Sequence, residues 1–152
     1  VTCIERDARC RDYLESTVGV QAIGSSNPAA VLAQLPPFDV IALWQVIEHL
    51  DEPLALLDSI AARLTAGGIL ALSTPNPEAF QFACMGKRWP HVDAPRHLHL
   101  MPANLLVQRM QSHGFEMCLL DSSDAQVDTP SRFKSSLRKA TGWRRSVSPR
   151  CS

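Results

Sequence analysis

The segment 38–76, with the sequence FDVIALWQVIEHLDEPLALLDSIAARLTAGGILALSTPN, constrains the fold more than any other part of the chain. Residues 38–44 form a short and almost entirely apolar run, which is typical of a strand buried on both faces of a parallel sheet. Apolar residues then recur every three or four positions, at Leu50, Leu54, Leu57, Ala61 and Leu64. This spacing predicts a helix that packs one face on the sheet. We expect the pair Gly67 and Gly68 to end the helix before a second strand. Strand, helix and strand in this order predict a βαβ unit.

Similar patterns lie on both sides of this unit. Apolar runs short enough for strands recur at 1–4, 18–23 and 115–120. Helical patterns separate them at 6–16, 28–35 and 103–111. Strands that alternate with helices predict an α/β fold with a mostly parallel sheet and flanking helices.

The chain has 152 residues, which is room for one domain with a substantial core. We place that domain at 1–121 and treat 122–152, which is basic, as a flexible tail without an antiparallel last strand. The formal net charge is zero, so composition gives no reason to expect a nucleic-acid partner. The basic tail alone could touch nucleic acid or an anionic surface, although a solvated tail is the commoner explanation.

The sequence also bears on location. No apolar run approaches the ~20 residues that a membrane span needs. The charged segment ERDARCRD at 5–12 stands where a signal peptide would have its apolar core. The five cysteines are scattered without a CxxC pair, which favours reduced structural thiols over disulfides or a zinc site. We therefore expect a cytoplasmic protein.

Three groups of residues together resemble the later motifs of class I S-adenosylmethionine-dependent methyltransferases: FDVI at 38–41, IEHLDEP at 47–53 and LTAGGILALSTPN at 64–76. The segment RWPHVDAPRHLHLMPANLLVQRMQSHGFE at 88–116 resembles the stretch that members carry between the fifth and sixth strands. The pattern is nearest to that of ubiquinone-biosynthesis O-methyltransferases and extends over 1–120. The resemblance implies a Rossmann-like sheet, here its second to sixth strands. It also implies methyl transfer from S-adenosylmethionine to a small-molecule acceptor by in-line displacement.

The resemblance assigns cofactor contacts to the ends of two strands. Glu5 follows the first apolar run, where a carboxylate can accept hydrogen bonds from ribose hydroxyls. The alternative is that Glu5 only stabilises the start of the next helix. Trp44, Gln45 and Val46 occupy the position at which relatives enclose the adenine and the sulfonium side of the cofactor. For Trp44 the alternative is a purely structural position in the core.

Histidines carry the candidate chemistry. His49 is a candidate general base that would take a proton from the acceptor, and the alternative is a structural histidine that bonds backbone. Relatives fold the loop around residues 91–99 over the acceptor, which makes Arg96, His97 and His99 candidates for substrate contact. A competing interpretation is that His97 and Asp93 hold this loop together.

We expect no metal. Some relatives have a second carboxylate at the position of Gln45, where a divalent cation can join the carboxylates and the neighbouring histidine. An amide at this position leaves mainly Glu48 to hold magnesium.

The family's first strand and glycine-rich turn are expected before Val1, because no GxGxxG-like turn occurs in the sequence. We therefore interpret the chain as a fragment, truncated at the N-terminus, that binds the cofactor weakly or not at all by itself. Two other functions stay open. One is a catalytically silent methyltransferase-like binding module. The other is an NAD(P)-dependent dehydrogenase, which also uses an acidic residue after the second strand but is disfavoured by IEHLDEP and LSTPN.

Overall fold

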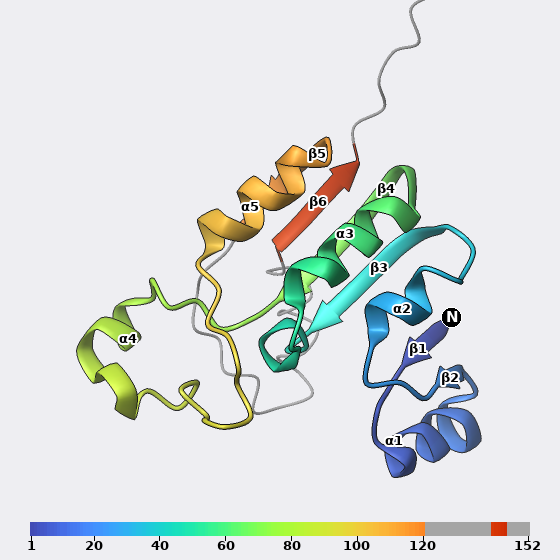
Figure 1. Ribbon diagram of the computed structural model, residues 1–152, viewed down its shortest axis with the longest axis horizontal. Coiled ribbons are helices and arrows are strands. Elements are labelled where there is room, and N and C mark those ends of the chain that lie inside the picture. Colours follow the sequence, from blue (N-terminus) through green and yellow to red (C-terminus); the bar gives the residue numbers. More distant parts are fainter. Residues whose placement is uncertain (121–140, 146–152) are drawn as a thin grey trace, which may run out of the picture.

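The structure of the protein, a computed structural model, describes residues 1–120 and 141–145 (Figure 1). In chain order its elements are β1 (Thr2–Ile4), α1 (Ala8–Tyr13), a π-helical turn (Leu14–Val18), β2 (Gln21–Ile23), α2 (Pro28–Leu32), β3 (Phe38–Trp44), a 3-10 helix (Ile47–His49), α3 (Pro53–Arg63), β4 (Leu64–Ser73), α4 (Phe80–Met85), a second 3-10 helix (Gly86–Arg88), α5 (Ala103–Ser112), β5 (Phe115–Leu119) and β6 (Thr141–Arg145). Within these residues, no helix has the length and apolar character needed to cross a membrane.

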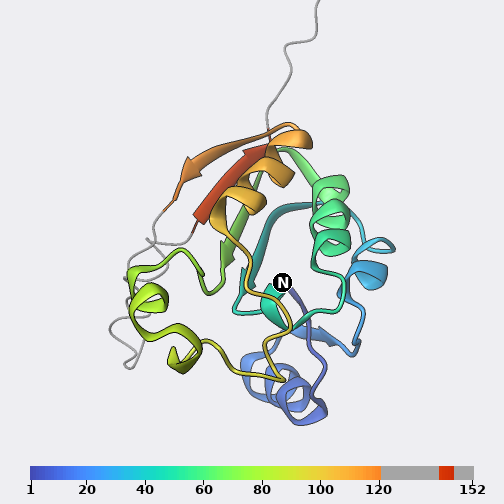
Figure 2. The ribbon, with the colours of Figure 1, turned by 60° about the vertical axis from the view of Figure 1, so that its left-hand side comes forward.

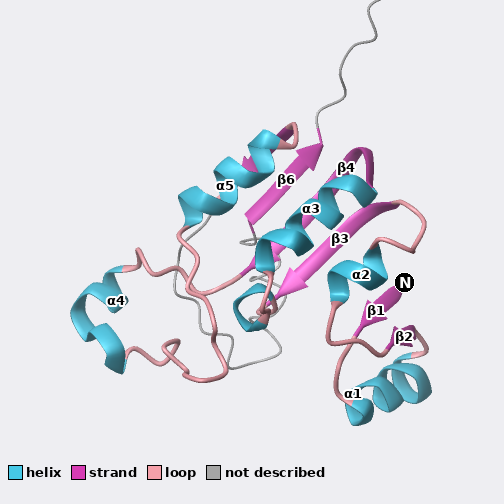
Figure 3. Ribbon diagram, viewed as in Figure 1, coloured by secondary structure: helices cyan, strands magenta, loops and turns pink. Residues whose placement is uncertain are grey.

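The strands form two sheets (Figure 3). β1 and β2 pair in parallel in the smaller one. The larger sheet has the order β3-β4-β6-β5, in which β3 and β4 are parallel and β6 is antiparallel to both of its neighbours. Strands alternate with helices along most of the chain, so the predicted α/β fold with parallel βαβ pairing is confirmed.

The predicted βαβ unit is present, but its glycine pair has another role. α3 begins with Pro53 at its first position, where the missing amide hydrogen costs nothing, and ends at Arg63. β4 starts at once, and its register shifts from Phe38 opposite Leu64 to Val40 opposite Ile69. Gly67, with φ of +81°, lies in this irregular stretch. The prediction that Gly67 and Gly68 end the helix is therefore wrong, because the strand needs glycine for its bulge.

Burial of β3 on both faces is also a wrong prediction. α3 and α5 lie on the same face of the larger sheet (Figures 1 and 2). Leu43 of β3 is buried on that side, while Val40 remains 60% exposed and Ile69 of β4 remains 40% exposed. A helix pair on one face buries only alternate residues of each strand, since neighbouring side chains point to opposite faces.

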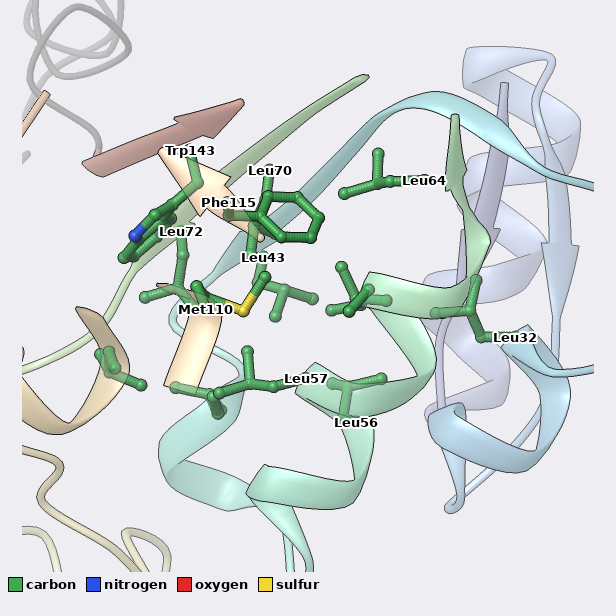
Figure 4. Close-up of a cluster of buried hydrophobic side chains, with 14 of the residues drawn as sticks. Leu32, Leu43, Leu56, Leu57, Leu64, Leu70, Leu72, Met110, Phe115 and Trp143 are labelled. Atoms are coloured by element: carbon green, nitrogen blue, oxygen red, sulfur yellow. The ribbon is translucent and has the colours of Figure 1, made fainter. Parts of the chain in front are cut away.

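The core lies between the larger sheet and the two helices (Figure 4). Leu57 and Ile60 of α3 and Met110 of α5 are completely buried. The sheet contributes Leu43, Leu70, Leu72, Phe115 and Trp143, and α2 contributes Leu32. This cluster fixes the ends of β3 and β4 relative to α3.

The expected tail 122–152 contains a strand of the sheet. Residues Thr141–Arg145 form β6 between β4 and β5, so the prediction of a tail without an antiparallel last strand is wrong for this stretch. Trp143 is only 1% exposed, and Arg145 donates a hydrogen bond to the Leu64 carbonyl (2.5 Å). A single large apolar side chain, with Gly142 before it and Arg144 after it, gives no alternating signal, which explains why the strand was not predicted. The rest of 122–152, and with it the flexible-tail prediction, lies outside the described residues.

An ionic network ties α3 to α5. Arg109 donates to both oxygens of Asp58, one of them through Nε at 2.8 Å, and His113 Nε2 lies 2.8 Å from Asp58 Oδ1. The hydrogen bond from Arg109 is the main cause that lowers the pKa of Asp58 below its usual value. Burial acts in the opposite direction, and the hydrogen bond from His113 lowers the pKa further.

We predict that Leu57→Ala lowers the free energy of unfolding by about 2–5 kcal/mol, because Leu57 is completely buried and truncation leaves a cavity. The matched control is Leu54→Ala on the same helix, which should cost less than about 1 kcal/mol since Leu54 is 38% exposed. Urea unfolding followed by circular dichroism measures both. Equal losses for the two variants would contradict the described core.

We predict a pH-dependent contribution from Asp58. Its folded pKa is lowered, so the stabilisation is present above the unfolded value of about 3.9 and is lost as pH falls through the folded value. The side chains of Arg109 and Asp58 are 38% and 40% exposed. This exposure limits the contribution of their ion pair to the free energy of unfolding to about 1 kcal/mol or less. Urea midpoints of Asp58→Asn and its parent should differ at pH 5 and converge at pH 2. A His113→Gln background removes the imidazole's own titration, and a difference that persists at pH 2 would refute the assignment.

Candidate active site

The candidate site lies at the carboxyl ends of the parallel strands. Figure 1 shows β1 and β3 running in the same direction, so their final residues face the same side of the molecule. Trp44 and Ser73, the last residues of β3 and β4, lie opposite each other in the register. In open α/β sheets, ligands bind in the crevice outside these ends.

Glu5 is half-buried directly after β1. Its amide donates to the Ile23 carbonyl (3.0 Å), and its Oε1 accepts from the Asp7 amide (2.8 Å). Asp7 in turn caps α1. The helix-start interpretation of Glu5 is thus visible in the structure, but it uses only one carboxylate oxygen. Among residues 1–120 and 141–145 no hydrogen bond occupies Oε2, which leaves it available to a ligand hydroxyl.

Arg11 positions the loop that carries Glu5, a role that the sequence did not reveal. Its Nη1 donates to the carbonyls of Glu5 (3.1 Å) and Arg6 (2.6 Å). A Cβ atom at Gly24 would lie 2.9 Å from Arg11 Cζ, so the glycine leaves room for the guanidinium. Arg11 therefore connects the loops after β1 and β2. The only sequence signal was an arginine inside the predicted helix.

The turn after β3 is held by Ser73. Gln45 has a positive φ of 52°, which is uncommon for a residue other than glycine. Its backbone N–H donates to the Ser73 carbonyl (2.9 Å), and its side-chain Nε2 donates to Ser73 Oγ (3.0 Å). Trp44 is half-buried, and Val46 packs partly against the core. The side chain of Gln45 is therefore hydrogen-bonded to the last residue of β4.

Glu48, which follows in the 3-10 helix, is completely buried. Its Oε2 accepts from Thr74 Oγ1 (3.0 Å), and its backbone carbonyl accepts from the amides of Leu98 (2.8 Å) and His99 (3.2 Å). Within the described part of the chain, Oε1 has no hydrogen-bond partner. Thr74 was not singled out from the sequence, although its position directly after β4 was a signal.

Two histidines lie beside Glu48. Nδ1 of His49 is 2.9 Å from the Arg96 carbonyl, and Nδ1 of His97 is 2.7 Å from the His91 carbonyl. A carbonyl only accepts, so each Nδ1 carries the hydrogen and Nε2 keeps its lone pair in the neutral ring. The ring centroids are 4.7 Å apart, and a ligand atom from each of Glu48, His49 and His97 lies within 4.8 Å of the others. The structure thus places His49, which was predicted as a general base, beside His97, which was predicted as a substrate contact.

The side chains of the other two predicted substrate contacts lie outside this cluster, although the Arg96 carbonyl contacts His49 and the His99 amide contacts Glu48. Arg96 forms an ion pair with Asp93, and its side chain is 76% exposed. The His97 amide donates to the Asp93 carbonyl (2.8 Å), so the competing loop-bracing interaction exists through backbone atoms. His99 lines a groove of about 520 Å³ between the start of α3 and residues 98–105. Leu98 in this groove is 48% exposed.

Comparison with known proteins identifies the family. A sequence profile described as a methyltransferase domain matches residues 3–120. The ubiquinone biosynthesis O-methyltransferase of Xanthomonas campestris pv. campestris is 34% identical over 88 residues, which are 57% of this chain and 37% of that protein. The chain therefore spans little more than a third of the length of this relative.

Solved structures show the same fold. An S-adenosylmethionine-dependent methyltransferase from Archaeoglobus fulgidus superposes with a TM-score of 0.62 at 15% identity, over 94% of this chain and 73% of that one. A second from Mesorhizobium loti gives 0.61 at 15% identity, over 95% and 80%. The fold is thus that of S-adenosylmethionine-dependent methyltransferases, as the sequence predicted. With the profile covering more than half of its length, the chain belongs to the methyltransferase-domain family.

Proposed function

We propose that this chain carries part of the cofactor site and the acceptor side of an S-adenosylmethionine-dependent methyltransferase that acts on a small molecule. The observation that carries the proposal is the membership in this family together with polar groups at the strand ends that no other described residue satisfies. When bound, the cofactor supplies a methyl group on a positively charged sulfur. The family match also speaks against a dehydrogenase.

The residues after β1 and β3 fit the chemistry of an adenosyl group. Glu5 offers a carboxylate oxygen to ribose hydroxyls while its other oxygen keeps the loop in place. Trp44, Gln45 and Val46 provide apolar surface and a rigid turn, and an aromatic or aliphatic face beside a purine excludes water. Arg11 is a positioning residue in this arrangement, since it holds the Glu5 carbonyl.

The loop 91–99, called the histidine loop below, and the neighbouring His49 fit an acceptor. His49 Nε2 is the proton-accepting nitrogen of its ring and lies on an exposed residue, so it can take a proton from an acceptor hydroxyl. His97 and Arg96 contact the acceptor from the loop, and His99 contacts it from the groove. The apolar residues Leu54 and Leu105 beside His99 favour an acceptor with an apolar portion.

A cytoplasmic location accompanies this proposal. The cysteines of the described residues are free thiols, which is the state that a reducing compartment maintains.

We predict that Glu5→Gln weakens the binding of S-adenosylhomocysteine at least about tenfold, because an amide nitrogen cannot accept from a ribose hydroxyl and a charge-assisted hydrogen bond contributes about 1.5–3 kcal/mol. Glutamine can still accept from the Asp7 amide through its remaining oxygen. This substitution therefore separates the ribose role from loop bracing. Isothermal titration calorimetry measures the affinity.

The matched control is Glu116→Ala, which removes an exposed carboxylate on β5 and should leave the affinity unchanged. Binding by Glu5→Gln that equals the wild-type binding would remove Glu5 from the cofactor site.

A further inference from the structure

We propose that the groove beside His99 selects acceptors that carry an apolar portion and a positive charge, both remote from the hydroxyl that is methylated. The inference rests on the proposed function and names the class of its substrate. The groove has a volume of about 520 Å³. One wall is the start of α3, and the other is the segment 98–105. We call it the His99 groove below.

The His99 groove adjoins the residues proposed to act on the acceptor. Asp51, only two positions after His49, lines the first wall. On the second wall, the amides of Leu98 and His99 donate to the Glu48 carbonyl (2.8 and 3.2 Å). The backbone contact that brings the histidine loop to the turn after β3 therefore also brings the two walls together. A ligand that contacts His49 can extend into the groove.

Three exposed leucines give the His99 groove an apolar surface. Leu105 of α5 is 40% exposed, and Leu54 of α3 and Leu98 of the histidine loop are exposed to a similar degree. Single exposed apolar side chains are ordinary on a protein surface, whereas apolar side chains gathered in one depression mark binding sites. These three come from separate segments, so the fold and not a local pattern gathers them.

Two carboxylates give the His99 groove its charge. Asp51 and Glu52 are exposed, and neither side chain forms a hydrogen bond or an ion pair with the residues that the structure describes. The described residues that line the groove include no lysine or arginine. Glu52 occupies the N-cap position of α3 without a capping hydrogen bond. Both carboxylates favour the helix dipole, but this role does not account for the uncovered leucines beside them.

The leucines and the carboxylates together select the sign of the ligand's charge. A ligand that covers the leucines also displaces water from the neighbouring carboxylates, and a carboxylate that loses water without gaining a partner is costly. A positive charge on the ligand supplies that partner, a neutral ligand does not, and a negative charge is repelled. An ammonium group on an apolar chain is therefore the chemistry that fits the His99 groove.

The test is titration of the full chain with two probes of equal chain length and opposite charge, octyltrimethylammonium and octanoate. The NMR signals of the leucine and methionine methyl groups report binding at low ionic strength. We expect octyltrimethylammonium to shift the methyl signals of Leu54, Leu98 and Leu105. We also expect it to bind about tenfold more tightly than octanoate, because two carboxylates attract one probe and repel the other.

Substitutions separate the charge from the apolar surface. Asp51→Asn combined with Glu52→Gln removes both charges at nearly constant shape, and the preference should fall to about twofold or less. Glu116→Gln, an exposed carboxylate on β5 outside the groove, is the matched control and should keep the full preference. Leu54→Ala should weaken both probes by a similar factor of about three, since it removes apolar contact and no charge. Circular dichroism checks each fold, and the two single charge variants repeat the test if the double variant loses stability.

Several outcomes would overturn the proposal. These are equal affinity of the wild type for the two probes, a preference that persists in the double variant, or no binding of octyltrimethylammonium. Shifts at Met85, which is 45% exposed on α4, without shifts at the three leucines would place the probe outside the His99 groove. Neither cofactor nor methyl transfer takes part in this titration, so its failure leaves the test of Glu5 untouched. Failure of the Glu5 test would in turn leave the charge preference of the groove standing.

Discussion

The candidate active site depends on one buried residue, Glu48, which forms hydrogen bonds with two other parts of the chain. Its carbonyl holds the histidine loop through the amides of Leu98 and His99, and its Oε2 accepts from Thr74 after β4. Its Oε1 remains unpaired within the described residues. Burying a carboxylate with an unpaired oxygen is unfavourable, so the surrounding packing must compensate for it. Such exceptions to hydrogen-bond satisfaction concentrate at sites that bind ligands or ions.

The packing that holds Glu48 comes from the βαβ unit. Ile47, directly before it, is completely buried, and Leu43 and Leu72 lie in the same core below the strand ends. The parallel register places Trp44 beside Ser73, so the two loops leave the sheet at the same level. A rigid edge of this kind can hold polar groups in place, while the loops themselves carry the chemistry.

The sequence predicted the parts of the molecule that local periodicity determines. Residues 38–44 became β3, and the stripe of apolar residues became α3, although Leu56 is buried where Leu54 was expected. β6 was missed because Trp143 is the one large apolar residue in its sequence. The site was predicted in pieces. His49 and His97 were both named, but their convergence depends on a backbone contact between distant segments that no local pattern encodes.

The two halves of the proposed site belong to different sheets. Glu5 follows β1 in the smaller sheet, and Glu48 and His49 follow β3 in the larger one, with no strand ladder between them in the part of the chain described. They are connected by α2, which packs on α3 and places Leu32 in the common core. In the described residues, the two halves of the site are connected only by helix packing. A ligand that contacts both halves would therefore connect them directly. Binding at the strand ends should thus be coupled to the relative placement of the two sheets, because a ligand stabilises whichever arrangement it contacts best.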